Sequence, residues 1–229
     1  MTASEALISA INAGDFSQVR ALIDKKHDVN AKDVNGDPAL FLALVGQHSD
    51  IARWLIRKGA DANSTNRYGS PVLHTAAGNG DLDVVKELVN KGADVNARFK
   101  RYDNMTALML ASQAGHESVV KFLLQKGADV NARTSLGDTA LIPATAAGHE
   151  GIVKLLLKKG VDVNAMSESG YTALFIAISE GNKDMVGLLL KQGANPNIKD
   201  KHGSTPVALA KRMRDSVMVD MLFEAGGKE

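Results

Sequence analysis

Several side chains in this sequence can move protons or bind metals, and their spacing indicates whether they do so. Six histidines are present, and three of them occupy one slot that returns along the chain, at His48, His116 and His149. Aspartates return in the same way within the phrase Asp-Val-Asn, at Asp94, Asp129 and Asp162. Clustered histidines or paired carboxylates would support metal binding or general acid–base catalysis. Residues that recur once per structural repeat form rows on successive repeats instead. We therefore expect no catalytic residue, no metal site and no cofactor site.

Motifs that indicate a specific chemistry are absent. The sequence has no H-E-x-x-H motif, EF-hand loop, Walker motif or dinucleotide-binding glycine motif. It has no cysteine, which excludes disulfides, thiolate ligands and cysteine nucleophiles. We expect a protein without enzymatic activity. A catalytic or small-ligand-binding module is the minor alternative, and it would require a deep pocket of converging polar groups.

Composition and charge limit the class of partner. Of 229 residues, 45% are hydrophobic and only 4% aromatic, which favours a core of small and medium side chains. The net charge of +1, from 27 basic and 26 acidic residues, gives no case for a nucleic-acid partner. No apolar run approaches the roughly 20 residues that a membrane span requires.

The compartment stays open at this point. The segment from Met1 to Gly14 lacks the basic and apolar regions of a signal peptide. A cytoplasmic location is the default, and a periplasmic or secreted one applies if a signal peptide precedes Met1 in the natural protein. The absence of cysteine is compatible with either.

Two phrases recur along the chain and define a repeat. One phrase reads Lys91-Gly-Ala-Asp-Val-Asn96, and its glycine returns at intervals of 33, 35, 33, 33 and 33 residues, at Gly59, Gly92, Gly127, Gly160, Gly193 and Gly226. The other phrase opens each repeat, as in Gly170-Tyr-Thr-Ala-Leu-Phe175. A fixed period of this length is typical of repeat architectures, in which neighbouring repeats stack because one repeat cannot bury its own apolar face.

Each repeat is predicted to contain two short helices and an extended arm. In residues 66–98, Pro71 marks the start of the first helix, and Gly80 ends it in a left-handed conformation. Asp81 then starts the second helix, and Gly92 ends it. In the later repeats a threonine is expected to cap the first helix, at Thr106, Thr139, Thr172 and Thr205.

These phrases resemble the ankyrin repeat family over nearly the whole chain. The resemblance implies an all-α solenoid of about seven stacked helix-turn-helix repeats with projecting β-hairpin-like arms. We expect a single domain over residues 1–229. Its predicted parts are an N-terminal cap at 1–32, repeats at 33–65, 66–98, 99–133, 134–166 and 167–199, and a C-terminal cap at 200–229.

The same resemblance implies where a partner would bind, because family members use the arm tips and the inner face of the first helices. Packing does not dictate the residues in these slots, and they differ between repeats. Asp37 occupies such a slot in the second repeat. The predicted partner-binding residues are Arg67, Tyr68, Phe99, Lys100, Arg101, Tyr102, Met105, Leu136, Asp138, Met166, Glu168, Tyr171, Lys201 and His202.

The arm of the fourth repeat differs most from the others. It is two residues longer, and Asn104 replaces the usual turn glycine, since asparagine tolerates left-handed geometry. Phe99, Arg101 and Tyr102 bring aromatic and guanidinium groups to this arm, and such groups dominate interface hot spots. Alternatively, Phe99 or Tyr102 folds back and packs on the neighbouring arm.

The sequence therefore predicts a scaffold that binds one protein partner. The chain consists of repeats alone and is expected to be a monomer by itself, which favours inhibiting or sequestering the partner. The family resemblance suggests roles such as bacterial immunity or self-protection against a lytic enzyme. An adaptor that bridges two partners is the alternative.

Overall fold

The computed structural model describes residues 2–25 and 28–229, and Met1, Lys26 and His27 lie outside the described residues. The chain divides into two compact bodies. The N-terminal body contains residues 1–111 and 118–128, and the C-terminal body contains residues 112–117 and 129–229. We describe each body by itself, and the single domain over residues 1–229 stays a prediction.

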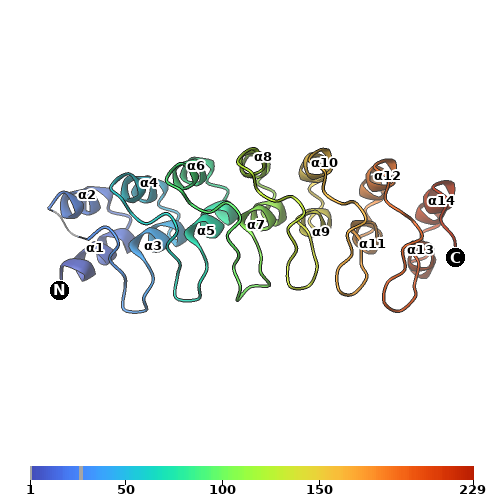
Figure 1. Ribbon diagram of the computed structural model, residues 1–229, viewed down its shortest axis with the longest axis horizontal. Helices are drawn as coiled ribbons and strands as arrows, with labels where there is room; N and C mark the ends of the chain where they lie inside the picture. Colours follow the sequence, from blue (N-terminus) through green and yellow to red (C-terminus); the bar gives the residue numbers. More distant parts are fainter. Residues whose placement is uncertain (1, 26–27) are drawn as a thin grey trace. The chain divides into compact units, whose positions relative to one another are not determined.

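The N-terminal body consists of helix pairs in two layers. Figure 1 shows the first helix of each pair beside the arms and the second helix above it, on the side away from the arms. We call these the inner and the outer helices. Inner α5 packs against α3 and α6, and outer α4 packs against α6. The helices are α1 (Ala3–Asn12), α2 (Phe16–Asp24), α3 (Ala39–Val45), α4 (Ser49–Arg57), α5 (Val72–Asn79), α6 (Leu82–Asn90), and most of α7 (Ala107–Ala114) and α8 (Glu117–Gln125).

The C-terminal body repeats the arrangement (Figure 1). Inner helix α11 packs against α9, α12 and α13, and the last pair closes with α13 against α14. The helices are α9 (Leu141–Ala146), α10 (Glu150–Lys158), α11 (Ala173–Ser179), α12 (Lys183–Lys191), α13 (Pro206–Arg212) and α14 (Ser216–Glu224). The residues that the structure describes thus form fourteen helices in pairs and no extended strand, and the predicted all-α class is confirmed.

The pair α5–α6 shows why the repeat sequence folds in this way. Pro71 directly precedes α5, where its missing N–H costs no helical hydrogen bond. Gly80 ends α5 with a φ of 76°, a left-handed conformation that glycine adopts without a Cβ clash. Asp81 then caps α6 by accepting a hydrogen bond from the Val84 N–H. These end signals agree with the sequence prediction.

The expected threonine hydroxyl bonds are present in all four repeats, and one helix starts later than expected. Thr172 and Thr205 cap α11 and α13, and the Thr106 hydroxyl accepts from the Met109 N–H near the start of α7. Helix α9 begins at Leu141 with Ala140 as its N-cap residue, later than expected, but the Thr139 hydroxyl still accepts a hydrogen bond from the Leu141 N–H at 3.4 Å. Pro143 explains the shift, because it has no N–H to bond the carbonyl of Thr139 four residues earlier.

The arms are narrow hairpin loops without extended strands. In the N-terminal body each is closed by one antiparallel bridge: Lys32 with Pro38, Thr65 with Pro71 and Phe99 with Met105. The arm of the fourth repeat is longer, as expected. Its closing hydrogen bond joins the Phe99 N–H to the carbonyl of Met105, whereas the preceding arm closes from residue 66 to residue 70. Asn104 has the expected left-handed conformation, with a φ of 55°, and Asp103 shares it.

An asparagine side chain connects successive repeats. The Asn63 carbonyl oxygen accepts from the Asp94 N–H at 2.9 Å, and its amide donates to the Gly92 carbonyl at 3.0 Å. We call this pair of bonds the asparagine clip. In the C-terminal body three asparagines form the same clip, at Asn131, Asn164 and Asn197. The aspartates of the phrase have a local role, since the Asp94 carboxylate accepts from the Asn96 N–H two residues later.

Removing one clip should weaken the contact between two repeats. We expect Asn63→Ala to lower the free energy of unfolding by about 1–2 kcal/mol, because two inter-repeat hydrogen bonds are lost. Urea unfolding followed by circular dichroism measures the change. Asn90→Ala, at the exposed end of α6, is the matched control and should change stability by less than about 0.5 kcal/mol. Equal effects of the two substitutions would contradict the clip's contribution.

Candidate protein-binding surface

The tips of two neighbouring arms in the N-terminal body bring together aromatic and guanidinium groups. The guanidinium carbons of Arg67 and Arg101 each lie 5.2 Å from the centre of the Tyr68 ring. The Tyr68 side chain is 50% exposed in spite of these contacts. Cations at this distance from an aromatic ring are attracted by its π electrons. We call Arg67, Tyr68, Phe99, Arg101 and Tyr102 the arm-tip cluster.

A buried carboxylate holds one of the two arginines. Asp37 is 3% exposed, and its carboxylate accepts from the Arg67 backbone N–H at 2.8 Å and pairs with the Arg67 Nε at 3.3 Å. The expectation that Asp37 contacts a partner is therefore wrong. Asp37 lies between two arms and bonds Arg67 of the neighbouring arm. This contact holds the Arg67 guanidinium in place at the surface.

The longer arm is supported from below by His74 on α5. The Phe99 ring stacks on Tyr102, with centroids 5.9 Å apart, and its other contact is edge-to-face with His74 at 6.4 Å. The His74 Nε2 lies 2.9 Å from the Met105 carbonyl oxygen, to which it donates a hydrogen bond. The sequence left contact and packing open for this arm. Phe99 is half-buried and mainly packs, whereas Tyr102 is 52% exposed.

Two other predicted residues of this arm differ in exposure. Lys100 is exposed at the tip, as a contact residue should be. Met105 is 8% exposed, because it follows the turn and enters the base of the arm. We correct the prediction for Met105, which packs inside the protein and offers little surface to a partner.

The C-terminal body exposes apolar groups on its own arms. Leu136, Met166 and Tyr171 are 49%, 46% and 39% exposed. The first two arms are joined by the Glu168 N–H, which donates to the Leu136 carbonyl at 2.7 Å. Arg133 reinforces this contact by donating to the Met166 carbonyl at 2.9 Å. These predicted residues are therefore held at fixed places on the arms.

The remaining predicted residues of this body vary in exposure. Glu168, Lys201 and His202 are exposed, and Asp138 is half-buried. The Lys201 N–H donates to the Ser169 carbonyl at 3.1 Å, which connects two further arms. A cavity of about 200 Å³ lies beside Tyr171 and reaches Phe175, Leu209 and Arg212. Sequence reasoning missed this cavity, because its walls come from two repeats.

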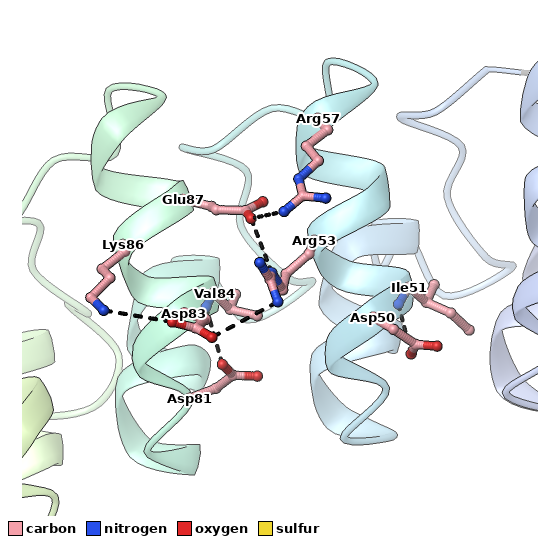
Figure 2. Close-up of polar contacts among 9 residues, drawn as sticks. All are labelled: Asp50, Ile51, Arg53, Arg57, Asp81, Asp83, Val84, Lys86 and Glu87. Carbon is pink, nitrogen blue, oxygen red and sulfur yellow. Dashed lines mark hydrogen bonds and ion pairs between the residues drawn. The ribbon is translucent and has the colours of Figure 1, made fainter.

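Outer helices α4 and α6 pair their charges with each other (Figure 2). One oxygen of Glu87 accepts from the Nε of Arg53 at 3.0 Å and from Arg57 at 2.6 Å. Asp83 lies 3.8 Å from Arg53 and 3.6 Å from Lys86. The two acidic residues of α6, Asp83 and Glu87, are thus paired with basic residues of α4 or α6.

The histidines and carboxylates occupy separate places. Within residues 2–25 and 28–229, no group of three or more histidine, aspartate or glutamate side chains is placed to hold a metal ion. His149 instead approaches the carbonyl of Gln113, at 3.1 Å. No helix in the part of the chain that is described is long and apolar enough to cross a membrane.

Paired short helices, projecting arms and inter-repeat clips define a helical repeat protein of the binding-scaffold class. The sequence model described as ankyrin repeats in three copies matches residues 7–99, 73–167, 108–200 and 165–228. The chain belongs to the ankyrin repeat family. Comparison with curated proteins gives no match. Ankyrin repeats generally mediate protein–protein interactions, and such scaffolds are typically non-catalytic.

Burial makes His74 sensitive to pH. Its side chain is 1% exposed, and its Nδ1 has no hydrogen-bond partner. Burial lowers the pKa of His74, while the hydrogen bond to Met105 and the charge of Asp94 act in the opposite direction. A lowered pKa means that the unfolded chain binds more protons than the folded chain at mildly acidic pH.

We expect the free energy of unfolding to be highest above about pH 6.5, the ordinary pKa of histidine, and to fall as the pH drops below it. Urea unfolding at a series of pH values measures this dependence. In His74→Gln the part of this pH dependence of the unfolding free energy that comes from His74 should disappear. His202→Gln, at an exposed site, should keep it. An unchanged slope in His74→Gln would assign the pH dependence to other groups.

Proposed function

We propose that this chain binds one partner protein through its arm tips and inner helices and blocks that partner by covering its surface. Support for the proposal comes from the family, whose repeats generally mediate protein–protein interactions. The observation that carries it is the arm-tip cluster, in which Tyr68 and Tyr102 are half exposed yet held by Arg67, Arg101 and Phe99. Side chains that are already ordered lose little conformational entropy on binding.

The composition of the cluster favours a protein partner. Tyrosine and arginine are enriched among the residues that contribute most to protein interfaces. The C-terminal body adds exposed Leu136, Met166 and Tyr171 on its arms. The proposed contact residues are the predicted set without Met105, whose side chain is buried. A role in which the chain protects its own cell by neutralising a lytic enzyme is one form of this proposal.

Substitution of the exposed part of the cluster tests the proposal. We expect Tyr68→Ala, Arg101→Ala and Tyr102→Ala together to lower the amount of partner captured from the native source about tenfold or more, since each is an interface-type side chain. Quantitative mass spectrometry of the captured material measures the change. Phe99 is left intact because its removal would disturb the packing on His74.

The matched control replaces three exposed lysines on outer helices, Lys121, Lys158 and Lys191, with alanine. This control should capture the partner normally, and circular dichroism should show both variants folded. Undiminished capture by the folded cluster variant would overturn the proposed surface. The mass of the purified complex distinguishes blocking from bridging, because an adaptor would hold two different partners at once.

A further inference from the structure

The exposed charges of the fourth-repeat arm are mostly basic. On outer helices α4 and α6 the basic and acidic groups pair across the helices (Figure 2). At the arm tip, Lys100 and Arg101 are exposed, and neither forms an ion pair with a carboxylate of the described residues. Arg98 adds a third positive charge to this arm, and Asp103 is the single carboxylate in its sequence.

The inner helices beside this tip add no acidic side chain. The inner helices α3 and α5, with the sequences ALFLALV and VLHTAAGN, contain no Asp, Glu, Lys or Arg, and His74 is their single titratable residue. Asp37 is buried and pairs with Arg67. The Asp33 carboxylate accepts hydrogen bonds from the N–H groups of Asn35 and Asp37 within its own turn. Asp33 and Asp37 keep their negative charges, but the fourth-repeat arm itself has three basic residues and one acidic residue, so its net charge is positive.

The geometry also prepares the cluster for a carboxylate. Arg67 and Arg101 both lie on the Tyr68 ring, which restricts their guanidinium groups without occupying their hydrogen-bond donors. A guanidinium presents a planar set of donors that matches a carboxylate in bidentate geometry. The exposed Tyr68 and Tyr102 rings supply apolar contact beside these donors.

We propose that the arm-tip cluster, together with Lys100, binds an acidic segment of the partner protein, rich in aspartate and glutamate. This inference rests on the proposed function and names the chemistry of the partner surface. The carboxylates of the segment pair with Lys100, Arg101 and the outer side of Arg67, and the chain between them packs on Tyr68 and Tyr102. A nucleic acid fits less well, because its binding is driven by many Lys and Arg contacts to phosphates, and this tip offers few cations.

Peptide probes test the proposal on the full chain without knowledge of the partner. The probes are a fluorescent twelve-residue peptide of alternating Glu and Gly, its twin with Gln in place of Glu, and a twelve-nucleotide thymidine oligomer. Anisotropy measures binding at ionic strengths of about 0.03 M and 0.3 M, which differ in charge screening. We expect the Glu peptide to bind at least about tenfold more tightly than the Gln twin at low salt, the effect of two to three ion pairs.

Charge reversal locates the binding. Lys100→Glu with Arg101→Glu should weaken binding of the Glu peptide about tenfold or more. The control, Lys121→Glu with Lys158→Glu on exposed outer-helix positions, changes the net charge equally and should weaken it less than about threefold. Nuclear magnetic resonance shifts of Tyr68 and Tyr102 should accompany binding in the unmodified chain.

Three results would overturn the inference: equal binding of the Glu and Gln peptides, equal weakening by both charge reversals, or tighter binding of the oligonucleotide than of the Glu peptide. None of them depends on capture of the natural partner. The triple alanine variant can abolish capture of the partner while the Glu peptide fails to bind. In that case the proposed protein-binding function is kept, and the proposed acidic character of the partner segment is rejected.

Discussion

The asparagine clip is the contact on which the arms of each body depend. One side chain, such as Asn63, bonds both the amide of Asp94 and the carbonyl of Gly92 in the next repeat. The glycine at that carbonyl ends an outer helix, so the clip fixes the place where one repeat leaves its helix pair and enters its arm. The asparagine side chain bonds only backbone groups of the next repeat. The clip therefore holds the repeats in register whatever side chains the arms carry. The arms are thereby free to differ.

Charged side chains are also distributed differently between the helices and the arms. In the N-terminal body the outer helices place Glu87 and Asp83 against Arg53, so their charges serve contacts within the layer. The inner helices α3 and α5 have no charged residue. Beside α3 and α5, the charged side chains are therefore carried by the arms. Exposed arm residues such as Lys100 can change without disturbing the core, whereas buried ones such as Asp37 and Met105 cannot.

The fold could be predicted from the sequence because each of its determinants is a local signal. Gly80 and Asn104 adopt left-handed backbone conformations that their residue types favour, and Asp81 caps a helix with its own side chain. All three behave as expected. The start of α9 differs from the prediction because a proline four residues after Thr139 changes it, an effect that the repeat pattern alone does not contain, although the Thr139 hydroxyl bond is present. The site was predicted less completely. Exposure depends on what the next arm does, so the burial of Met105 and Asp37 could not be deduced from their slots.

Contacts between arms also explain why the cluster is more than a set of exposed residues. Tyr68 and Arg101 occupy neighbouring arms, and they meet because the clips set the spacing between repeats. The two extra residues of the fourth-repeat arm, with left-handed turns at Asp103 and Asn104, give this arm a tip that the shorter arms lack. Phe99 and His74 then support the tip from below. An insertion that would cost stability in a helix instead creates, in an arm, an ordered group of hydrogen-bond donors and aromatic rings at the surface.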